Sequence, residues 1–332
     1  MDIDLDKPLV SVIMTAYNAS AYIDEAIDSI LYQTFANFEL LVLNDASTDS
    51  TEKIILEKQL RDKRIKYFKN ENNCGLSRTK NQLIPLAVGK YIALADADDV
   101  SQPKRFEKQI DVLNKFPEIS IVGSTISLVN NKRRVCGAWQ YPEDDASIKE
   151  GLEEASMIAN PVAMFRREVF FKINGYNEHL IICEDWDFYY RASKYFNFKN
   201  IPESLLYYRF HNSNTSFTKL EYTVLYAVCF KYKLPMSSFE NTLPQFVKLY
   251  PMYTQSVCYN VNRFYVFSMD TLLKLDYPNL STQLYKQVLE AFFVFFDRPS
   301  KKIFIKSCIV IHLKNKRFVR LPSLIKDYFL IK

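Results

Sequence analysis

The chain has 332 residues, of which 48% are hydrophobic and 24% are charged, a balance that excludes a disordered protein and supports a large buried core. It begins MDIDLDKPLV, without the basic start and long apolar run of a secretory signal. No other stretch reaches the roughly 18 uncharged apolar residues that a membrane-spanning helix needs. We therefore expect a cytoplasmic protein.

Charge is distributed unevenly along the chain. Residues 219–332 contain 17 Lys and Arg against 7 Asp and Glu, whereas residues 1–218 contain 26 against 31. A basic C-terminal part next to an acidic N-terminal part indicates an anionic partner, either a membrane surface or a nucleic acid.

The first hundred residues alternate between two kinds of hydrophobic pattern. Runs of apolar and β-branched residues predict strands at 8–15, 38–45, 65–70 and 90–96. Helical spacing and capping residues predict helices between them at 21–33, 47–60 and 76–87. This alternation predicts a parallel sheet with helices on both faces, which is the α/β class.

Polar residues follow three of these strands, where ligands bind in open α/β sheets. The sequences are TAYN at 15–18, NDAS at 44–47 and DADD at 96–99. If the strands are adjacent, they form one rim that suits a nucleoside. Tyr17 can stack on a base, Asp45 can accept a hydrogen bond from a base N–H, and an Asp can accept from ribose hydroxyls.

Neither of the glycine-rich phosphate-binding motifs, GxGxxG and GxxxxGK[ST], occurs in the chain. The charge of a bound diphosphate would therefore have to be neutralised by other groups. Asp98, with Asp96 nearby, offers the hard oxygen ligands that Mg²⁺ and Mn²⁺ prefer. Arg78 can supply a further positive charge.

Each of these residues also has a structural interpretation. Asp45 can be a turn residue or the N-cap of the helix that follows. Tyr17 can pack on a surface and Arg78 can be a solvated helix residue. Asp99 can bind either the metal or the backbone of its own turn.

The rest of the chain continues in mixed patterns. We expect a helix at 103–116, paired strands in 119–129, and a strand, a helix and a Gly-containing turn in 160–178. Residues 216–332 show helical spacing. From Arg298 onward, ten Lys and Arg stand against one acid, interleaved with Ile, Phe and Leu, which predicts either a membrane-surface helix or an ordinary helix with solvated lysines.

Five segments in order, TAYN, NDASTDST, GLSRTKN, GKYIALADADD and CEDWDFYYR, resemble family 2 glycosyltransferases with the GT-A fold over about residues 8–210. The resemblance implies a nucleotide-sugar donor, usually UDP-linked, a divalent metal (Mn²⁺ or Mg²⁺) at the Asp-x-Asp motif, and inversion at the anomeric carbon. It assigns the metal to Asp98. It assigns the nucleotide to Thr15, Ala16, Tyr17, Asn18, Asp45, Arg78, Asp96 and Ala97.

Sugar transfer by a single displacement needs one base to take the proton of the acceptor hydroxyl. Glu184, Asp185 and Asp187 are the candidates, and all three can instead cap a helix. The acid pair of the family implies that Asp185 is the base. Trp186 either stacks on a sugar or is a buried helix residue. His211 lies in a segment that resembles the Tyr-Arg-x-His sequence found late in members of the family. The resemblance implies that His211 contacts the metal or the diphosphate, and the alternative is a purely structural role.

These observations predict a GT-A catalytic domain at 1–215, with a donor half at about 1–100 and an acceptor half at about 101–215, and a helical basic region at 216–332. The Gln-x-x-Arg-Trp motif of processive synthases is missing, so we expect transfer of one sugar to a glycan or lipid-linked acceptor in cell-surface polysaccharide synthesis. The basic tail adds the option of a peripheral position on the inner face of the membrane.

Three other functions compete with this hypothesis. A nucleotidyltransferase would carry a Gly-rich basic loop where this chain has TAYNASAY. A nucleic-acid binder leaves the acidic rim at 96–99 unexplained, so no nucleic-acid partner is expected. A non-catalytic sugar-nucleotide-binding scaffold of the same fold would usually have lost Asp98 or Asp185.

Overall fold

A computed structural model describes residues 7–129, 134–153, 155–180, 182–209 and 211. The chain divides into two compact units, Met1–Val129 with Gly137–Arg209, and Asn130–Cys136 with Phe210–Lys332. The predicted helical region 216–332, including the basic tail, lies outside the described residues. The architecture described below is that of the first unit, apart from the first residues of β7.

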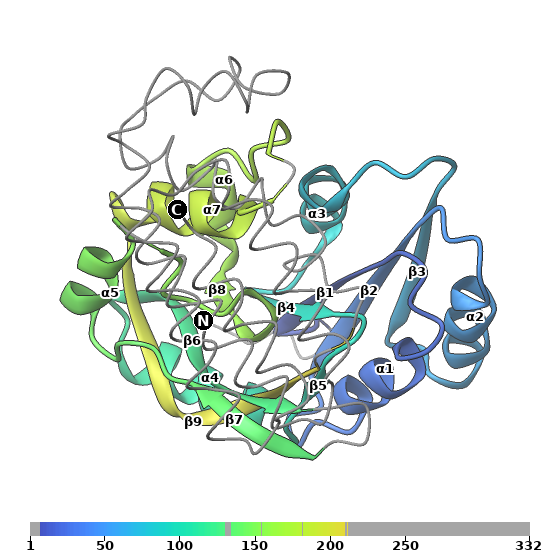
Figure 1. Cartoon of the computed structure of the whole chain (residues 1–332), viewed down its shortest axis with the longest axis horizontal. Coiled ribbons are helices and arrows are strands. Elements are labelled where there is room, and N and C mark those ends of the chain that lie inside the picture. The colour runs from blue at the N-terminus through green and yellow to red at the C-terminus, as the bar shows by residue number, and fades with distance from the viewer. Residues whose placement is uncertain (1–6, 130–133, 154, 181, 210, 212–332) are drawn as a thin grey trace, which may run out of the picture. The chain divides into compact units, whose positions relative to one another are not determined.

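The first half of this unit is a parallel sheet, as predicted (Figure 1). Its strands are β1 (Val10–Ala16), β2 (Phe38–Asp45), β3 (Ile65–Asn70) and β4 (Tyr91–Asp96). The connecting helices are α1 (Ile23–Leu31), α2 (Thr51–Arg61) and α3 (Leu76–Leu83), the last followed by the 3₁₀ turn η1 (Ile84–Leu86). The spatial order β3-β2-β1-β4 places β1 between the second and fourth strands.

The second half of the sheet is mixed rather than parallel. It contains β5 (Val100–Ser101), β6 (Ile119–Val129), β7 (Val135–Trp139), β8 (Met164–Arg166) and β9 (Asn197–Arg209). The helices are α4 (Arg105–Lys115), α5 (Asp145–Gly151), α6 (Arg167–Lys172) and α7 (Glu184–Ser193), with the 3₁₀ turn η2 (Asn160–Val162). β8 runs antiparallel to β4 and to β6, whereas β9 is parallel to β6. The paired strands expected within 119–129 are one 11-residue strand, whose partner β7 follows residues 130–133.

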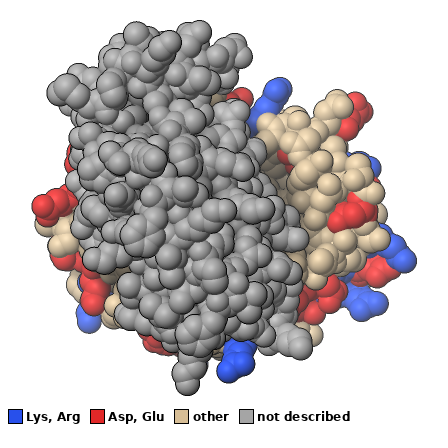
Figure 2. Space-filling model, viewed as in Figure 1, with Lys and Arg blue, Asp and Glu red and all other residues tan. Residues whose placement is uncertain are grey.

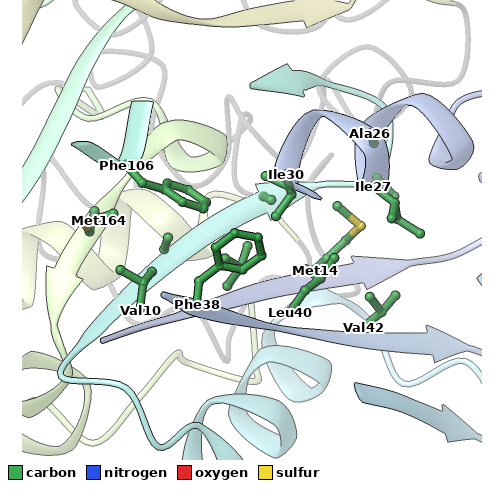
Figure 3. Close-up of a cluster of buried hydrophobic side chains, with 14 of the residues drawn as sticks. Val10, Met14, Ala26, Ile27, Ile30, Phe38, Leu40, Val42, Phe106 and Met164 are labelled. Carbon is green, nitrogen blue, oxygen red and sulfur yellow. The ribbon is translucent and has the colours of Figure 1, made fainter. Parts of the chain in front are cut away.

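Side-chain alternation explains why helices cover both faces of the parallel strands. Successive residues of a strand point to opposite faces. Val10, Val12 and Met14 of β1 belong to a core cluster with buried residues of α1, α2 and α4, and Figure 3 shows part of this cluster. α3 contacts β1 and β2 and lies on the face opposite α1, where Figure 1 shows it. β1 and β2 are mostly apolar because both of their faces are buried, and the polar side chains they contain, such as Ser11 and Glu39, are hydrogen-bonded.

The visible described surface around α1, α2 and α3 carries acidic and basic side chains in alternation (Figure 2). Ion pairs on this side include Lys58 with Asp28 at 2.6 Å and Lys69 with Glu52 at 2.8 Å. Within the part of the chain that the structure describes, no helix combines the length and the hydropathy that crossing a bilayer requires.

Candidate active site

The three polar strand ends meet at one edge of the sheet. Thr15 of β1 is the register partner of Asp96 of β4, and Ala16 of β1 is the partner of Asn44 of β2. The predicted adjacency of TAYN, NDAS and DADD is therefore confirmed. The carboxyl edge of the parallel strands carries the residue types that could receive a nucleoside.

The loops after β1 and β2 are hydrogen-bonded to each other. The Asn18 N–H donates to Ser47 Oγ at 2.9 Å, and the Thr48 N–H donates to Asn18 Oδ1 at 2.8 Å. Asn18 and Ala46 both adopt positive φ angles, of 48° and 60°, so the chain turns sharply at each loop. Asn18 thus shapes the rim, while the neighbouring Tyr17 ring is 52% exposed.

Asp45 organises the loop that leads into α3. Its side chain is 4% exposed and accepts hydrogen bonds from the backbone N–H groups of Cys74 and Gly75 and from Asn70 Nδ2, at 2.7 to 3.1 Å. The alternative that Asp45 caps the next helix is not seen, because α2 has Ser50 at its N-cap. Asp45 therefore holds the backbone just before α3, the helix that carries Arg78.

Three carboxylates converge just after β4. Asp96, Asp98 and Asp99 each place one oxygen within 4.8 Å of the other two. Burial and the charge of Asp98 raise the pKa of Asp96 from 3.8 to about 7, and burial together with Asp98 and Asp96 raises that of Asp99 well above its usual value. The cluster is electrostatically costly without a counter-charge.

This cluster fits a hard divalent cation. Asp99 Oδ1 accepts from the Arg209 N–H at 2.8 Å, but its buried Oδ2 has no hydrogen-bond partner. Mg²⁺ and Mn²⁺ prefer carboxylate oxygens, and an octahedral ion with bonds of about 2.1 Å spaces its ligands roughly 3 to 4 Å apart. The convergence of the three oxygens and the orphaned oxygen of Asp99 are both compatible with such an ion.

Two buried arginines bind backbone oxygens near the carboxylates, one in the turn after β4 and one in β4 itself. Arg209 of β9 donates from Nε to the Asp98 carbonyl oxygen at 2.9 Å and pairs with Glu25 of α1 at 2.5 Å. Arg105 of α4 donates from Nη2 to the Leu94 carbonyl oxygen at 2.6 Å. Sequence reasoning missed both arginines, because nothing in the local pattern of either residue shows that it binds a backbone oxygen of this segment.

The three acids at the start of α7 have different partners. Glu184 pairs with Lys80 of α3 at 3.0 Å, and Asp187 pairs with Arg191 at 2.8 Å. Among the described residues, no ion pair involves Asp185, whose Oδ1 accepts only from the N–H of Trp186. Within the part of the chain that the structure describes, Asp185 is thus the acid of this turn that has no ion pair.

The environment of Asp185 raises its proton affinity. Burial and the adjacent Glu184 raise the pKa of Asp185 from 3.8 to about 6, an effect that Lys80 partly offsets. A carboxylate with this pKa is ionised at neutral pH and is a stronger base than an ordinary Asp. Trp186 is 5% exposed and donates from Nε1 to the Leu152 carbonyl oxygen, so it is the buried helix residue of the two alternatives.

Comparison with known proteins identifies the family. The sequence profile of Glycosyl transferase family 2 matches residues 11–173. A glycosyltransferase of Haemophilus influenzae is 37% identical over 222 residues, which are 63% of this chain and 68% of the relative. This chain belongs to glycosyl transferase family 2.

Other relatives of this glycosyltransferase extend the comparison. The Escherichia coli O-antigen biosynthesis glycosyltransferase WbnJ is 32% identical, covering 64% of this chain and 84% of WbnJ. Staphylococcus aureus TarS 1–349 in complex with UDP-GlcNAc superposes with a TM-score of 0.56 at 20% identity, over 85% of this chain and 91% of TarS 1–349. Mannosyltransferase PcManGT from Pyrobaculum calidifontis, in complex with GDP-Man and Mn²⁺, superposes with a TM-score of 0.56 at 14% identity, over 98% and 88%. The two structures confirm the GT-A fold class.

The ligand roles of all the site residues remain predictions, including those of Arg78 and His211. Arg78 lies on α3, two residues before the buried Lys80, and its side chain is exposed to solvent. His211 is buried and belongs to the second unit, and its metal contact stays a prediction.

Proposed function

We propose that this protein is a metal-dependent, inverting glycosyltransferase that moves one sugar from a UDP-sugar to a glycan or lipid-linked acceptor in cell-surface polysaccharide synthesis. The observation that carries the proposal is the convergence of Asp96, Asp98 and Asp99 at the strand edge beside Thr15. Family membership, the UDP-GlcNAc complex of TarS and the role of WbnJ in O-antigen biosynthesis support it.

In this proposal the rim holds the nucleotide. The exposed ring of Tyr17 stacks on the base, and Asp45 accepts from a base N–H at the floor of the same rim. Thr15, Ala16 and Asn18 line the start of the loop, and Ala97 lies between the two acids of the Asp-x-Asp motif. Asp96 accepts from the ribose, and the exposed Arg78 balances phosphate charge.

Asp98 holds the divalent cation, with Asp99 and His211 as further ligands. When bound, the cation neutralises charge that develops on the leaving diphosphate. The three carboxylates define where it binds, Arg209 holds their turn through the Asp98 carbonyl oxygen, and Arg105 holds β4 just before it through the Leu94 carbonyl oxygen. Mn²⁺ and Mg²⁺ both suit these oxygens, and a histidine ligand favours Mn²⁺.

Asp185 acts as the base. It removes the proton of the acceptor hydroxyl while that oxygen attacks the anomeric carbon from the side opposite the diphosphate, so the configuration inverts. Within the described residues Asp185 has no ion-pair partner, whereas Glu184 and Asp187 are each held by a cation. A non-catalytic scaffold would not need such a carboxylate.

A panel of nucleotide sugars tests the proposal. The protein is incubated with each donor and Mn²⁺, with and without oligosaccharide and lipid-linked acceptors, and the release of nucleotide diphosphate is followed. We expect one donor class to turn over, and an Asp98→Asn variant to lose this activity. Asp111→Asn, the same change on an exposed residue of α4, is the control. Absence of turnover with every donor and acceptor rejects the proposed function.

The basic tail from Arg298 is proposed to hold the enzyme at an anionic membrane surface, where a lipid-linked acceptor would lie. Flotation of the full chain with vesicles that contain anionic lipid tests this, with neutral vesicles as the control. We expect binding that weakens as salt rises, because exposed charges are screened. Binding that is absent or insensitive to salt contradicts the membrane role.

A further inference from the structure

Lys80 is the feature of the site that the assigned roles leave unexplained. Its side chain is 4% exposed and that of Glu184 is 8% exposed, and their Nζ and Oε1 atoms lie 3.0 Å apart. The pair joins α3, in the donor half, to the first turn of α7, in the acceptor half. Two buried charges are stable together only when each compensates the other.

The surroundings of Lys80 strengthen this link. Its ammonium lies 5.0 Å from the centroid of the Tyr176 ring, and that ring stacks on Phe188 of α7 with centroids 4.4 Å apart. Burial works against the charged form of Lys80, but Glu184, Tyr176 and Asp96 together outweigh it, so the pKa of Lys80 is raised. The ammonium therefore stays charged and keeps its hold on the helix.

A second tie runs beside the first. The neighbouring Asn81 clamps the backbone of Tyr176, accepting from its N–H at 2.8 Å and donating to its carbonyl oxygen at 2.9 Å. From α7, Arg191 donates to the carbonyl oxygens of Ile173 and Gly175, at 2.5 and 2.7 Å. The segment 173–176 is thus held from both helices, while Lys80 pairs with Glu184 in the first turn of α7, next to Asp185.

The start of α7 needs such an anchor. Its N-cap, Cys183, has a φ of 61°, a conformation that costs free energy in a residue other than glycine, and its side chain makes no capping hydrogen bond. The first turn carries three acids in sequence order 184, 185 and 187, whose charges repel. A cation that binds the first of them offsets both effects.

We propose that Lys80 is a positioning residue for the base: by binding Glu184 it fixes the first turn of α7, so that Asp185, rather than Glu184, is presented to the acceptor. This inference rests on the proposed function, in which Asp185 is the base. It assigns no contact between Lys80 and the substrate. Loss of Lys80 should therefore reduce kcat and leave the donor KM unchanged.

The test compares Lys80→Met, Glu184→Gln and the double variant with wild type. The double variant removes both charges, so it leaves no uncompensated buried ion and keeps a folded protein available for measurement. We expect each variant to lower kcat at least tenfold with donor KM within twofold, and the double variant to be no worse than the poorer single. Lys80→Arg, which keeps the charge, should recover part of the loss. Lys58→Met, which breaks the pair between α1 and α2, is the matched control and should leave kcat unchanged.

Hydrogen exchange supplies a readout that does not need turnover. We expect the amides of residues 183–189 to exchange at least tenfold faster in the double variant, and those of α1 to be unaffected. Wild-type kcat and exchange in a folded double variant overturn the inference, as does a loss of UDP affinity equal to the loss of kcat. If wild type turns over no donor, the proposed function fails, and the exchange data alone decide whether Lys80 anchors α7.

Discussion

Glu184 and Asp185 are neighbours in the chain but lie in opposite electrostatic environments. The Glu184 carboxylate is buried and paired with Lys80 at 3.0 Å, whereas Asp185 is partly exposed and has no ion pair among the described residues. Adjacent helix residues point about 100° apart, so one can face the interior while the next faces the site. The two acids are therefore not interchangeable, and substitutions can separate their roles.

The first prediction concerns the base. Asp185→Asn should lower kcat by about 10² to 10⁴, the range that general bases contribute, because the amide cannot accept a proton. UDP affinity should stay within twofold of wild type, since Asp185 is assigned no nucleotide contact. Steady-state kinetics and calorimetry measure the two quantities. Asp187→Asn is the comparison. An equal loss of kcat in that variant would show that Asp185 is not the base.

The second prediction concerns pH. The pKa of Asp185 is raised from 3.8 to about 6, and only the ionised form acts as a base. Activity should thus be full above pH 7 and fall tenfold per unit below about pH 6, whereas an unperturbed Asp would hold activity down to about pH 4. A profile of kcat/KM from pH 5 to 8 measures this limb. A midpoint of this limb near pH 4 would show that the Asp185 carboxylate does not lie in the buried environment that raises its pKa.

The third prediction concerns metal removal. EDTA should abolish transfer, and Mn²⁺ should restore it, because the carboxylates at 96, 98 and 99 repel one another and the diphosphate when no cation is bound. Asp98→Asn should lose the stimulation of UDP binding by Mn²⁺ in calorimetry. Asp111→Asn should keep it. Equal UDP binding by wild type with Mn²⁺ and with EDTA contradicts the assignment.

The parallel half of the fold could be predicted from sequence because its signals are local. β1 and β2 are apolar at almost every position, since both faces are covered, and the helices between them carry one apolar stripe. The same logic placed the three polar strand ends on one rim. The direction of β8 could not be predicted in this way, because its three residues contain no signal of whether they run with β4 or against it.

The sequence predicted candidate site residues at the strand ends and, through the family resemblance, at Arg78 and Asp185, but not the buried charges around them. Lys80 and Arg105 look like ordinary charged helix residues in sequence, yet both are buried: Lys80 pairs with Glu184, and Arg105 donates to the backbone oxygen of Leu94 and to neighbouring side chains. Lys80 and Glu184 are 104 residues apart. Long-range pairing of this kind leaves no periodic trace, so a single sequence does not show it.

The fourth prediction concerns the nucleotide base. Tyr17→Ala should weaken UDP binding by roughly ten- to a hundredfold, because stacking of a base on an aromatic ring contributes about 1 to 3 kcal/mol. Tyr17→Phe should bind nearly as well as wild type, since the ring is kept. Tyr32→Ala removes a tyrosine that is 76% exposed at the end of α1 and should have no effect. Unchanged affinity in Tyr17→Ala would remove the ring from the proposed nucleotide site.

The fifth prediction concerns the turn that α3 and α7 both hold. Gly175 has a φ of +68°, and an added Cβ would lie 2.7 Å from Asn81 Oδ1 and 3.0 Å from Phe170 Cζ. Gly175→Ala should lower the free energy of unfolding by about 2 to 3 kcal/mol, because the left-handed conformation alone costs a side chain about 1 to 2 kcal/mol and Asn81 must also give up its bond to the Tyr176 N–H. Gly137→Ala is the control, since its Cβ would meet Leu128 at 3.7 Å, an ordinary contact, and it should change stability by less than about 0.5 kcal/mol. Urea unfolding measures both, and similar values for the two variants would mean that the Asn81 clamp does not constrain this turn.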